Sequence, residues 1–134
     1  VSHKPAVKLL QGEYLADELK GIIGSCDMFL GCHLHPTIAS TSMGIPTTVI
    51  ASSDKYHRLI GKTMGQKAYI VDTRNCPPHE LLTQIKARID SLWANREAIK
   101  QELEKRAKMA KEQAWSYGKL IEELAQSSKK ASAS

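Results

Sequence analysis

Three short apolar segments alternate with helix-forming segments, and this alternation constrains the fold more than any other feature of the sequence. Met28–Gly31, Thr47–Ala51 and Ala68–Val71 are apolar or β-branched almost throughout and lack polar alternation. Strands that are apolar on both faces are buried on both faces, as in parallel sheets covered by helices. The sequence therefore predicts an α/β fold, a Rossmann-like parallel sheet of three to four strands with flanking helices and long C-terminal helices.

Helices are expected between and after these strands. His35 is the predicted N-cap of a helix whose first turn holds Pro36, and Gly24, Gly44 and Gly65 are predicted helix ends. Apolar residues recur at spacings of three and four after Pro78. The expected helices are Asp17–Ile23, Pro36–Met43, Asp54–Met64, one that begins at Pro78, and one from Asn95 through Ala125.

The length of 134 residues predicts one domain. We expect a single α/β lobe over residues 1–125 and a disordered Ser/Ala/Lys-rich tail over residues 126–134. Ser2–Pro5 is expected to be frayed, and Ala6–Leu10 to form a strand entering from a missing N-terminal part. The last helix, about 28 residues and about 42 Å long, exceeds the width of so small a domain. Part of its apolar stripe should therefore pack on a missing N-terminal lobe or on another copy in a homo-oligomer, and we expect the C-terminal half of a larger protein.

Charge and motifs exclude several classes of function. The net charge of +5 is spread along the chain and lacks a basic–aromatic cluster, so nucleic acid is not an expected partner. The longest uncharged stretch, Met28–Ser53, is interrupted by histidine, proline and glycine, so no membrane span is expected. There is no P-loop and no G-x-G-x-x-G fingerprint, and we expect no cofactor. Three cysteines without a signal peptide favour reduced thiols and a cytoplasmic location.

The segment Gly31–Thr37 is the candidate site. Ligands of open parallel sheets bind at the carboxyl ends of strands, where helix N-termini attract anions. His33, His35 and the Thr37 hydroxyl follow a predicted strand and precede a predicted helix, and strand geometry would put the two imidazoles on one side. The sequence predicts a phosphate or carboxylate site with histidine available for proton transfer. The structural alternative is that His35 only caps the helix and His33 is a packed surface residue.

Metal binding and thiol chemistry are weaker interpretations of the same segment. Cys32, His33 and His35, with His57 and Cys76 elsewhere, supply enough ligand atoms, but no C-x-x-C or H-x-x-x-H pair occurs. We therefore expect no metal. A Cys32 nucleophile would need a positioned imidazole, and neighbouring residues on a strand point to opposite faces.

The segment Ser25–His35, SCDMFLGCHLH, resembles the C-terminal signature of the polysaccharide pyruvyl transferase family. The family pattern is S-C-D, two hydrophobic residues, G-S-R-L-H, a short helix, G-hydrophobic-P, a strand and a lysine soon after. The resemblance covers about Leu15–Val71. It implies a Rossmann-like C-terminal lobe of a GT-B-like two-lobed enzyme. The matching residues after His35 are Ala39, Gly44-Ile45-Pro46, Val49-Ile50, Ser53 and Lys55.

The resemblance implies transfer of a pyruvyl group from phosphoenolpyruvate to two hydroxyls of a glycan, forming a ketal in polysaccharide biosynthesis. His35 matches the family histidine and is the expected catalytic acid or base. His33 stands where the family has arginine, so a titratable imidazole replaces a fixed bidentate anion clamp. Lys55 matches the family lysine and supplies positive charge, and Thr37 is the best anion donor on the helix. Asp27 is expected to be structural, bonded to nearby backbone N–H groups.

Two alternatives stay open. A GT-B glycosyltransferase has a related arrangement of aspartate, strand, helix and G-x-P, and its helix N-terminus receives a nucleotide-sugar diphosphate. A non-catalytic binding or assembly module would keep the fold and use its long helix for association, with Lys55 a plain surface residue. The first interpretation predicts that the isolated chain lacks turnover even when folded.

Overall fold

The computed structural model describes residues 6–133, so the prediction for Ser2–Pro5 lies outside the described residues. The predicted α/β fold is confirmed: three parallel strands lie in the order β1-β2-β3. Phe29 pairs with Thr47, and Val49 pairs with both Gly31 and Ile70. The strands are β1 (Phe29–Gly31), β2 (Thr47–Ala51) and β3 (Ile70–Asp72).

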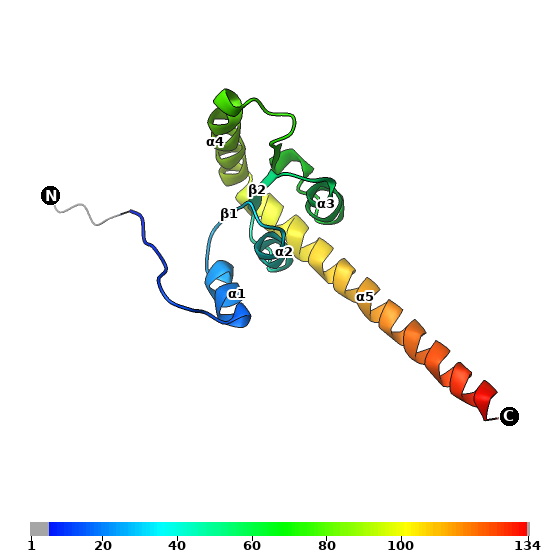
Figure 1. Ribbon diagram of the computed structural model, residues 1–134. Coiled ribbons are helices and arrows are strands. Elements are labelled where there is room, and N and C mark those ends of the chain that lie inside the picture. Colours follow the sequence, from blue (N-terminus) through cyan, green and yellow to red (C-terminus); the bar gives the residue numbers. More distant parts are fainter. Residues whose placement is uncertain (1–5, 134) are drawn as a thin grey trace.

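Helices cover both faces of this sheet (Figure 1). The helix α4 packs on β2 and β3 on one side, whereas α2 and α3 lie on the other side with the helix η1. Both connections between the strands therefore cross on the same face, as right-handed crossovers require. The helical elements are α1 (Ala16–Gly24), α2 (Leu34–Ser42), α3 (Asp54–Tyr56), the π-helix η1 (His57–Thr63), the 3-10 helix η2 (Lys67–Tyr69), α4 (Pro78–Ala94) and α5 (Arg96–Ser132).

Two clusters of buried side chains hold these layers together. The first joins β2 and β3 to the helices α3 and η1, with Leu34 of α2 packed against it. The second joins α4 and α5 to the end of η1, and it anchors α5 through Ile99 and Leu103. The buried members are Val49, Ala51, Tyr56, Ile60 and Ile70 in the first cluster, and Met64, Leu92, Ile99 and Leu103 in the second.

Several predicted boundaries differ from the observed ones. Ala6–Leu10 is not a strand: it is exposed and has no neighbouring strand to pair with among the described residues. Gly44 and Gly65 end helices with φ angles of 77° and 71°, as predicted. Gly24 instead lies inside α1, and Ser25 is the C-cap. The predicted helix Asp54–Met64 is a short α-helix that widens into a seven-residue π-helix.

The long helix α5 continues to Ser132, seven residues beyond the predicted end at Ala125. The segment assigned to a disordered tail holds four Ser beside two Lys, two Ala and one Gln, which are good helix formers, and no Gly or Pro follows Gly118. At 1.5 Å per residue the helix is about 55 Å long, and its C-terminal half extends away from the rest of the molecule (Figure 1). Within residues 6–133, no helix is both long and apolar enough to cross a membrane.

Candidate functional site at the carboxyl edge of the sheet

The strands β2 and β3 end level with each other at Ala51 and Asp72, and β1 ends at Gly31 opposite Val49. The loops that follow the three strands lie at the same edge of the sheet. Hydrogen bonds tie these loops together. The Tyr56 hydroxyl donates to the Cys32 carbonyl at 2.8 Å, and the Thr73 backbone N–H donates to the Ala51 carbonyl at 2.9 Å. The edge is therefore a connected surface, on which side chains from three separate loops are held in place.

His33 and His35 lie at this edge, but not as a strand would place them. The helix α2 begins at Leu34, two residues earlier than predicted, so His33 is the N-cap residue and His35 lies in the first turn. The His35 N-cap prediction is therefore wrong, and strand geometry does not relate the two imidazoles. Both side chains are exposed, and the His33 side chain makes no capping hydrogen bond. The first N–H groups of α2 thus keep their capacity to bind an anion.

Thr37 is not exposed, as a residue that donates to an anion would be; its hydroxyl makes a hydrogen bond within the protein. Its side chain is fully buried, and its hydroxyl donates to the His33 carbonyl at 2.6 Å. A Cβ atom at Gly31 would lie 2.6 Å from this hydroxyl oxygen, so only glycine fits at the end of β1. Thr37 therefore fixes the backbone that carries His33, and its hydroxyl proton is already committed.

Lys55 is exposed in α3, directly after the loop that follows β2. Its neighbour Asp54 forms an ion pair with Arg74 at 2.9 Å between Nη2 and Oδ1. Among the described residues, Lys55 itself has no ion-pair partner. The ammonium group is therefore available to an anionic ligand at this edge.

A cluster of His57, Asp72 and Arg74 lies at the same edge and was not predicted from the sequence. The Asp72 carboxylate contacts His57 Nε2 at 2.7 Å and accepts hydrogen bonds from Arg74 Nε at 3.0 Å and Nη2 at 2.7 Å. Hydrogen bonds from Arg74, and to a smaller extent the hydrogen bond with His57, hold the pKa of Asp72 well below its usual range. Hydrogen bonds to Asp72 and Asp54 in turn raise the pKa of Arg74. One arginine thus pairs with both aspartates and offsets one of their two negative charges. The sequence signal for this cluster is only an Asp-x-Arg triplet at a strand end.

The remaining predicted ligands do not gather into a metal site. Cys26 and Cys32 are exposed, Cys76 is half-buried, and all three are free thiols. Within residues 6–133, no three His, Cys, Asp or Glu side chains come close enough together to hold a metal ion. Asp27 is exposed beside Arg96 and Lys100, and its carboxylate makes none of the expected backbone hydrogen bonds within the described part of the chain.

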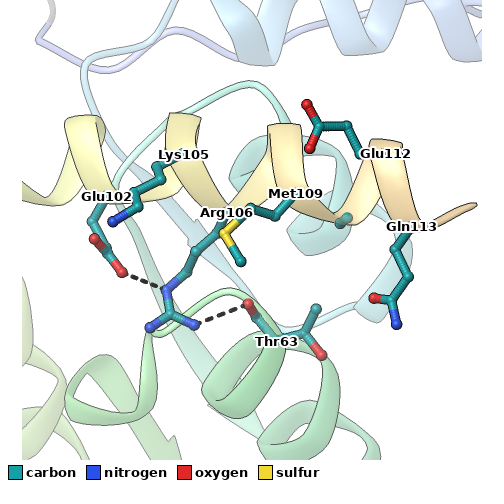
Figure 2. Close-up of a pocket in the computed structure, with 8 residues that line it drawn as sticks. Thr63, Glu102, Lys105, Arg106, Met109, Glu112 and Gln113 are labelled. Carbon is teal, nitrogen blue, oxygen red and sulfur yellow. Dashed lines mark hydrogen bonds and ion pairs between the residues drawn. The ribbon is translucent and has the colours of Figure 1, made fainter.

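A separate hollow lies along α5 (Figure 2). Arg106 spans it, bonded to Glu102 at 2.6 Å and to the Thr63 carbonyl at 3.3 Å. Because η1 leads from β2 back to the start of β3, Thr63 lies toward the amino edge of the sheet. The contacts of Arg106 in this hollow hold α5 against η1. The hollow is distinct from the carboxyl edge that carries the histidines.

Comparison with known proteins identifies one family. The family described as polysaccharide pyruvyl transferase matches residues 2–54 of the 134. The predicted resemblance is confirmed. This is a family of transferases, and its match includes α1, β1, α2 and β2 with His33, Thr37 and His35. No curated protein and no solved structure matches the chain.

The pyruvyl transferase match ends at Asp54, one residue before Lys55. It therefore covers the β1 and β2 side of the carboxyl edge, where the two histidines lie. The His57–Asp72–Arg74 cluster and all of α4 and α5 lie beyond it.

Proposed function

We propose that this chain is the C-terminal, donor-binding lobe of a two-lobed, GT-B-like transferase that moves a pyruvyl group from phosphoenolpyruvate to a glycan. A second, N-terminal lobe would complete the cleft and bind the glycan. The pyruvyl transferase match over residues 2–54 supports this reaction class. Free cysteines support a reducing compartment such as the cytoplasm.

One observation carries the proposal: within the described residues His33, His35 and Lys55 at the carboxyl edge have no ion-pair partner, whereas Asp54 and Asp72 are paired. Arg74 binds both Asp54 and Asp72. His33 and His35 remain exposed at the start of α2, and Lys55 is exposed in α3 after the neighbouring strand β2. A donor with a phosphate and a carboxylate would therefore meet cationic side chains and helix N–H groups, while Arg74 offsets part of the negative charge of the two aspartates.

The proposed chemistry needs a proton donor and a cationic site. One glycan hydroxyl adds to C2 of phosphoenolpyruvate while a proton is delivered to the C3 methylene. The second hydroxyl then replaces the phosphate at C2, and the products are a cyclic ketal and inorganic phosphate. Of the two hydroxyl protons released, one balances the proton added at C3 and the other leaves with the phosphate. In this proposal protonated His35 delivers the proton, while His33 and Lys55 bind the anionic groups. Thr37 holds the backbone of His33 in position through its hydrogen bond.

Thermal unfolding of the isolated chain tests the donor. Phosphoenolpyruvate is expected to raise the Tm, because a ligand that binds only the folded state stabilises it by about 2.7 kcal/mol at 100 times its Kd. Uridine and guanosine diphosphates are expected to leave the Tm unchanged. Lys55→Ala should reduce the shift, whereas Lys67→Ala, which removes an exposed lysine from η2, should not.

Other patterns of Tm shift would favour one of the two alternative functions. A Tm raised by a nucleoside diphosphate and not by phosphoenolpyruvate contradicts the proposal and favours a glycosyltransferase donor lobe. If no phosphorylated donor changes the Tm, the result favours a non-catalytic binding or assembly module.

A further inference from the structure

The imidazole of His57 is held by a carboxylate through one ring nitrogen, and its other ring nitrogen is unbonded. Nε2 lies 2.7 Å from Oδ2 of Asp72, the last residue of β3. The His57 side chain is 38% exposed, whereas that of Asp72 is 9% exposed. Within residues 6–133, Nδ1 of His57 has no hydrogen-bond partner. The ring is therefore oriented through one nitrogen and can exchange a proton through the other, as in the imidazole–carboxylate pairs of enzymes.

Arg74 decides which ring nitrogen of His57 carries the proton. It donates to the Asp72 carboxylate through its backbone N–H at 2.9 Å, through Nε at 3.0 Å and through Nη2 at 2.7 Å. These hydrogen bonds keep the carboxylate ionised, because they hold the pKa of Asp72 well below its usual range. An ionised carboxylate can only accept a hydrogen bond, so Nε2 of His57 is the donor. In the neutral imidazole, Nδ1 is then unprotonated and able to take up a proton.

The turn Asp54–His57 connects this pair to the loop that carries the two candidate histidines. Asp54 and His57 are three positions apart, which puts them on one side of the turn, and both contact the end of β3 or the loop after it. Tyr56, from the same turn, donates at 2.8 Å to the Cys32 carbonyl in the loop after β1. One short turn therefore spans the carboxyl edge of the sheet from β1 to β3.

The spacing across this edge suits two groups that act on neighbouring atoms of one small ligand. Adjacent strands lie about 4.8 Å apart, so β1 and β3 run about 10 Å apart. His35 follows β1, and His57 contacts the last residue of β3. His57 is also the first residue of the π-helix η1, and π-helices are rare elements that occur frequently at functional sites. A donor bound at this edge would therefore have one imidazole on each side.

We propose that His57, oriented by Asp72, is the base that takes a proton from the glycan hydroxyl as this hydroxyl attacks C2 of phosphoenolpyruvate. The inference rests on the proposed transferase function and assigns a role that His35 cannot fill. His35 begins the reaction protonated, because it supplies the proton to C3, so it cannot accept the hydroxyl proton in the same step. A second group, neutral at the start, is needed for that proton.

The protons balance over one reaction cycle. In the first step the bond between C2 and the first glycan oxygen forms, protonated His35 gives its proton to C3, and neutral His57 takes the hydroxyl proton onto Nδ1. In the second step the second glycan oxygen bonds to C2, and the bond between C2 and the phosphate oxygen breaks. The proton of the second hydroxyl passes to His35, and His57 gives its proton to the departing phosphate. Both imidazoles thus return to their starting states when the ketal and the phosphate leave.

The pH profile of pyruvyl transfer by the longest natural protein that contains this chain tests the role of His57. The wild-type rate is expected to fall at acid pH, where His57 is protonated, and at alkaline pH, where His35 has lost its proton. His57→Gln should lower kcat about 10²–10⁴-fold and abolish the acid-side fall, because glutamine can donate to Asp72 but cannot take up a proton. Asp, Lys and Arg side chains keep their charge between about pH 5 and pH 9. This applies to the charged residues that neighbour His57 in the chain or join its carboxylate network, which are Asp54, Lys55, Arg58, Asp72 and Arg74.

Two controls separate catalysis from folding and from donor binding. The 134-residue chain with His57→Gln should keep the rise in Tm with phosphoenolpyruvate, because other side chains bind the donor. His79→Gln, which changes an exposed histidine of α4, should keep kcat and the acid-side fall.

The outcomes distinguish this inference from the proposed function. If the wild type forms the ketal and His57→Gln keeps its kcat or its acid-side fall, the role of His57 is overturned and the transferase function stands. Loss of the Tm rise in His57→Gln also overturns it, since His57 would then bind the donor or hold the fold. A wild-type protein that forms no ketal from phosphoenolpyruvate overturns the proposed function itself.

Discussion

His35→Ala is expected to lower kcat for pyruvyl transfer by about 10²–10⁴-fold, the usual contribution of a positioned general acid. The loss should appear in kcat more than in KM for phosphoenolpyruvate, because the proton is needed in the transition state and the anionic groups are bound by His33 and Lys55. The assay is made on the longest natural protein that contains this chain, since the proposed cleft needs a second lobe.

His79→Ala is the matched control for this prediction. His79 is an exposed histidine at the start of α4, where its nearest charged contact is Glu80 at 3.7 Å. Its replacement should leave kcat unchanged. Transfer at the wild-type rate by the His35→Ala protein would contradict the assignment of His35 as the acid.

Asp72→Asn is expected to lower the Tm by several degrees at neutral pH, because it removes the negative charge and one of the two carboxylate oxygens that contact Arg74 and His57. The folded state lowers the pKa of Asp72, chiefly through its hydrogen bonds from Arg74. Asp72 therefore contributes its full stabilisation above the ordinary aspartate pKa of about 3.9 and loses it as the pH falls through the lower folded value.

The Tm difference between the wild type and Asp72→Asn should accordingly be largest near pH 7 and shrink below about pH 4. Thermal unfolding followed by circular dichroism over this range measures it. Asp90→Asn, at an exposed position of α4 without an ion-pair partner in the described chain, should show little difference at any pH. A difference between the wild type and Asp72→Asn that stays constant down to acid pH would exclude the ion-pair explanation.

Elements with a strong local signal could be predicted from the sequence. The β-branched run Thr47–Ala51 coincides with β2, and Gly44 and Gly65 end helices in the left-handed conformation that glycine adopts most easily. The segment His33–Leu34–His35 has no such signal, and the start of α2 there was misplaced by two residues. The π-helix η1 was missed because its sequence also fits an ordinary helix.

The candidate site was predictable only in part, for a physical reason. His33 and His35 could be placed at the carboxyl edge because they directly follow a clear strand. The contact between His57 and Asp72 joins residues fifteen positions apart and exists only because β2 and β3 are parallel neighbours. The buried Thr37 hydroxyl depends likewise on how closely α2 approaches Gly31, which sequence spacing does not reveal.

Mass spectrometry of the glycan product tests the central claim most directly. The longest natural protein that contains this chain is incubated with a glycan that has two neighbouring free hydroxyls, and with either phosphoenolpyruvate or a nucleotide-sugar. The account predicts that phosphoenolpyruvate adds the mass of one pyruvate less one water and releases one phosphate per glycan modified. Transfer of a sugar from the nucleotide-sugar, with no ketal formed from phosphoenolpyruvate, would contradict it.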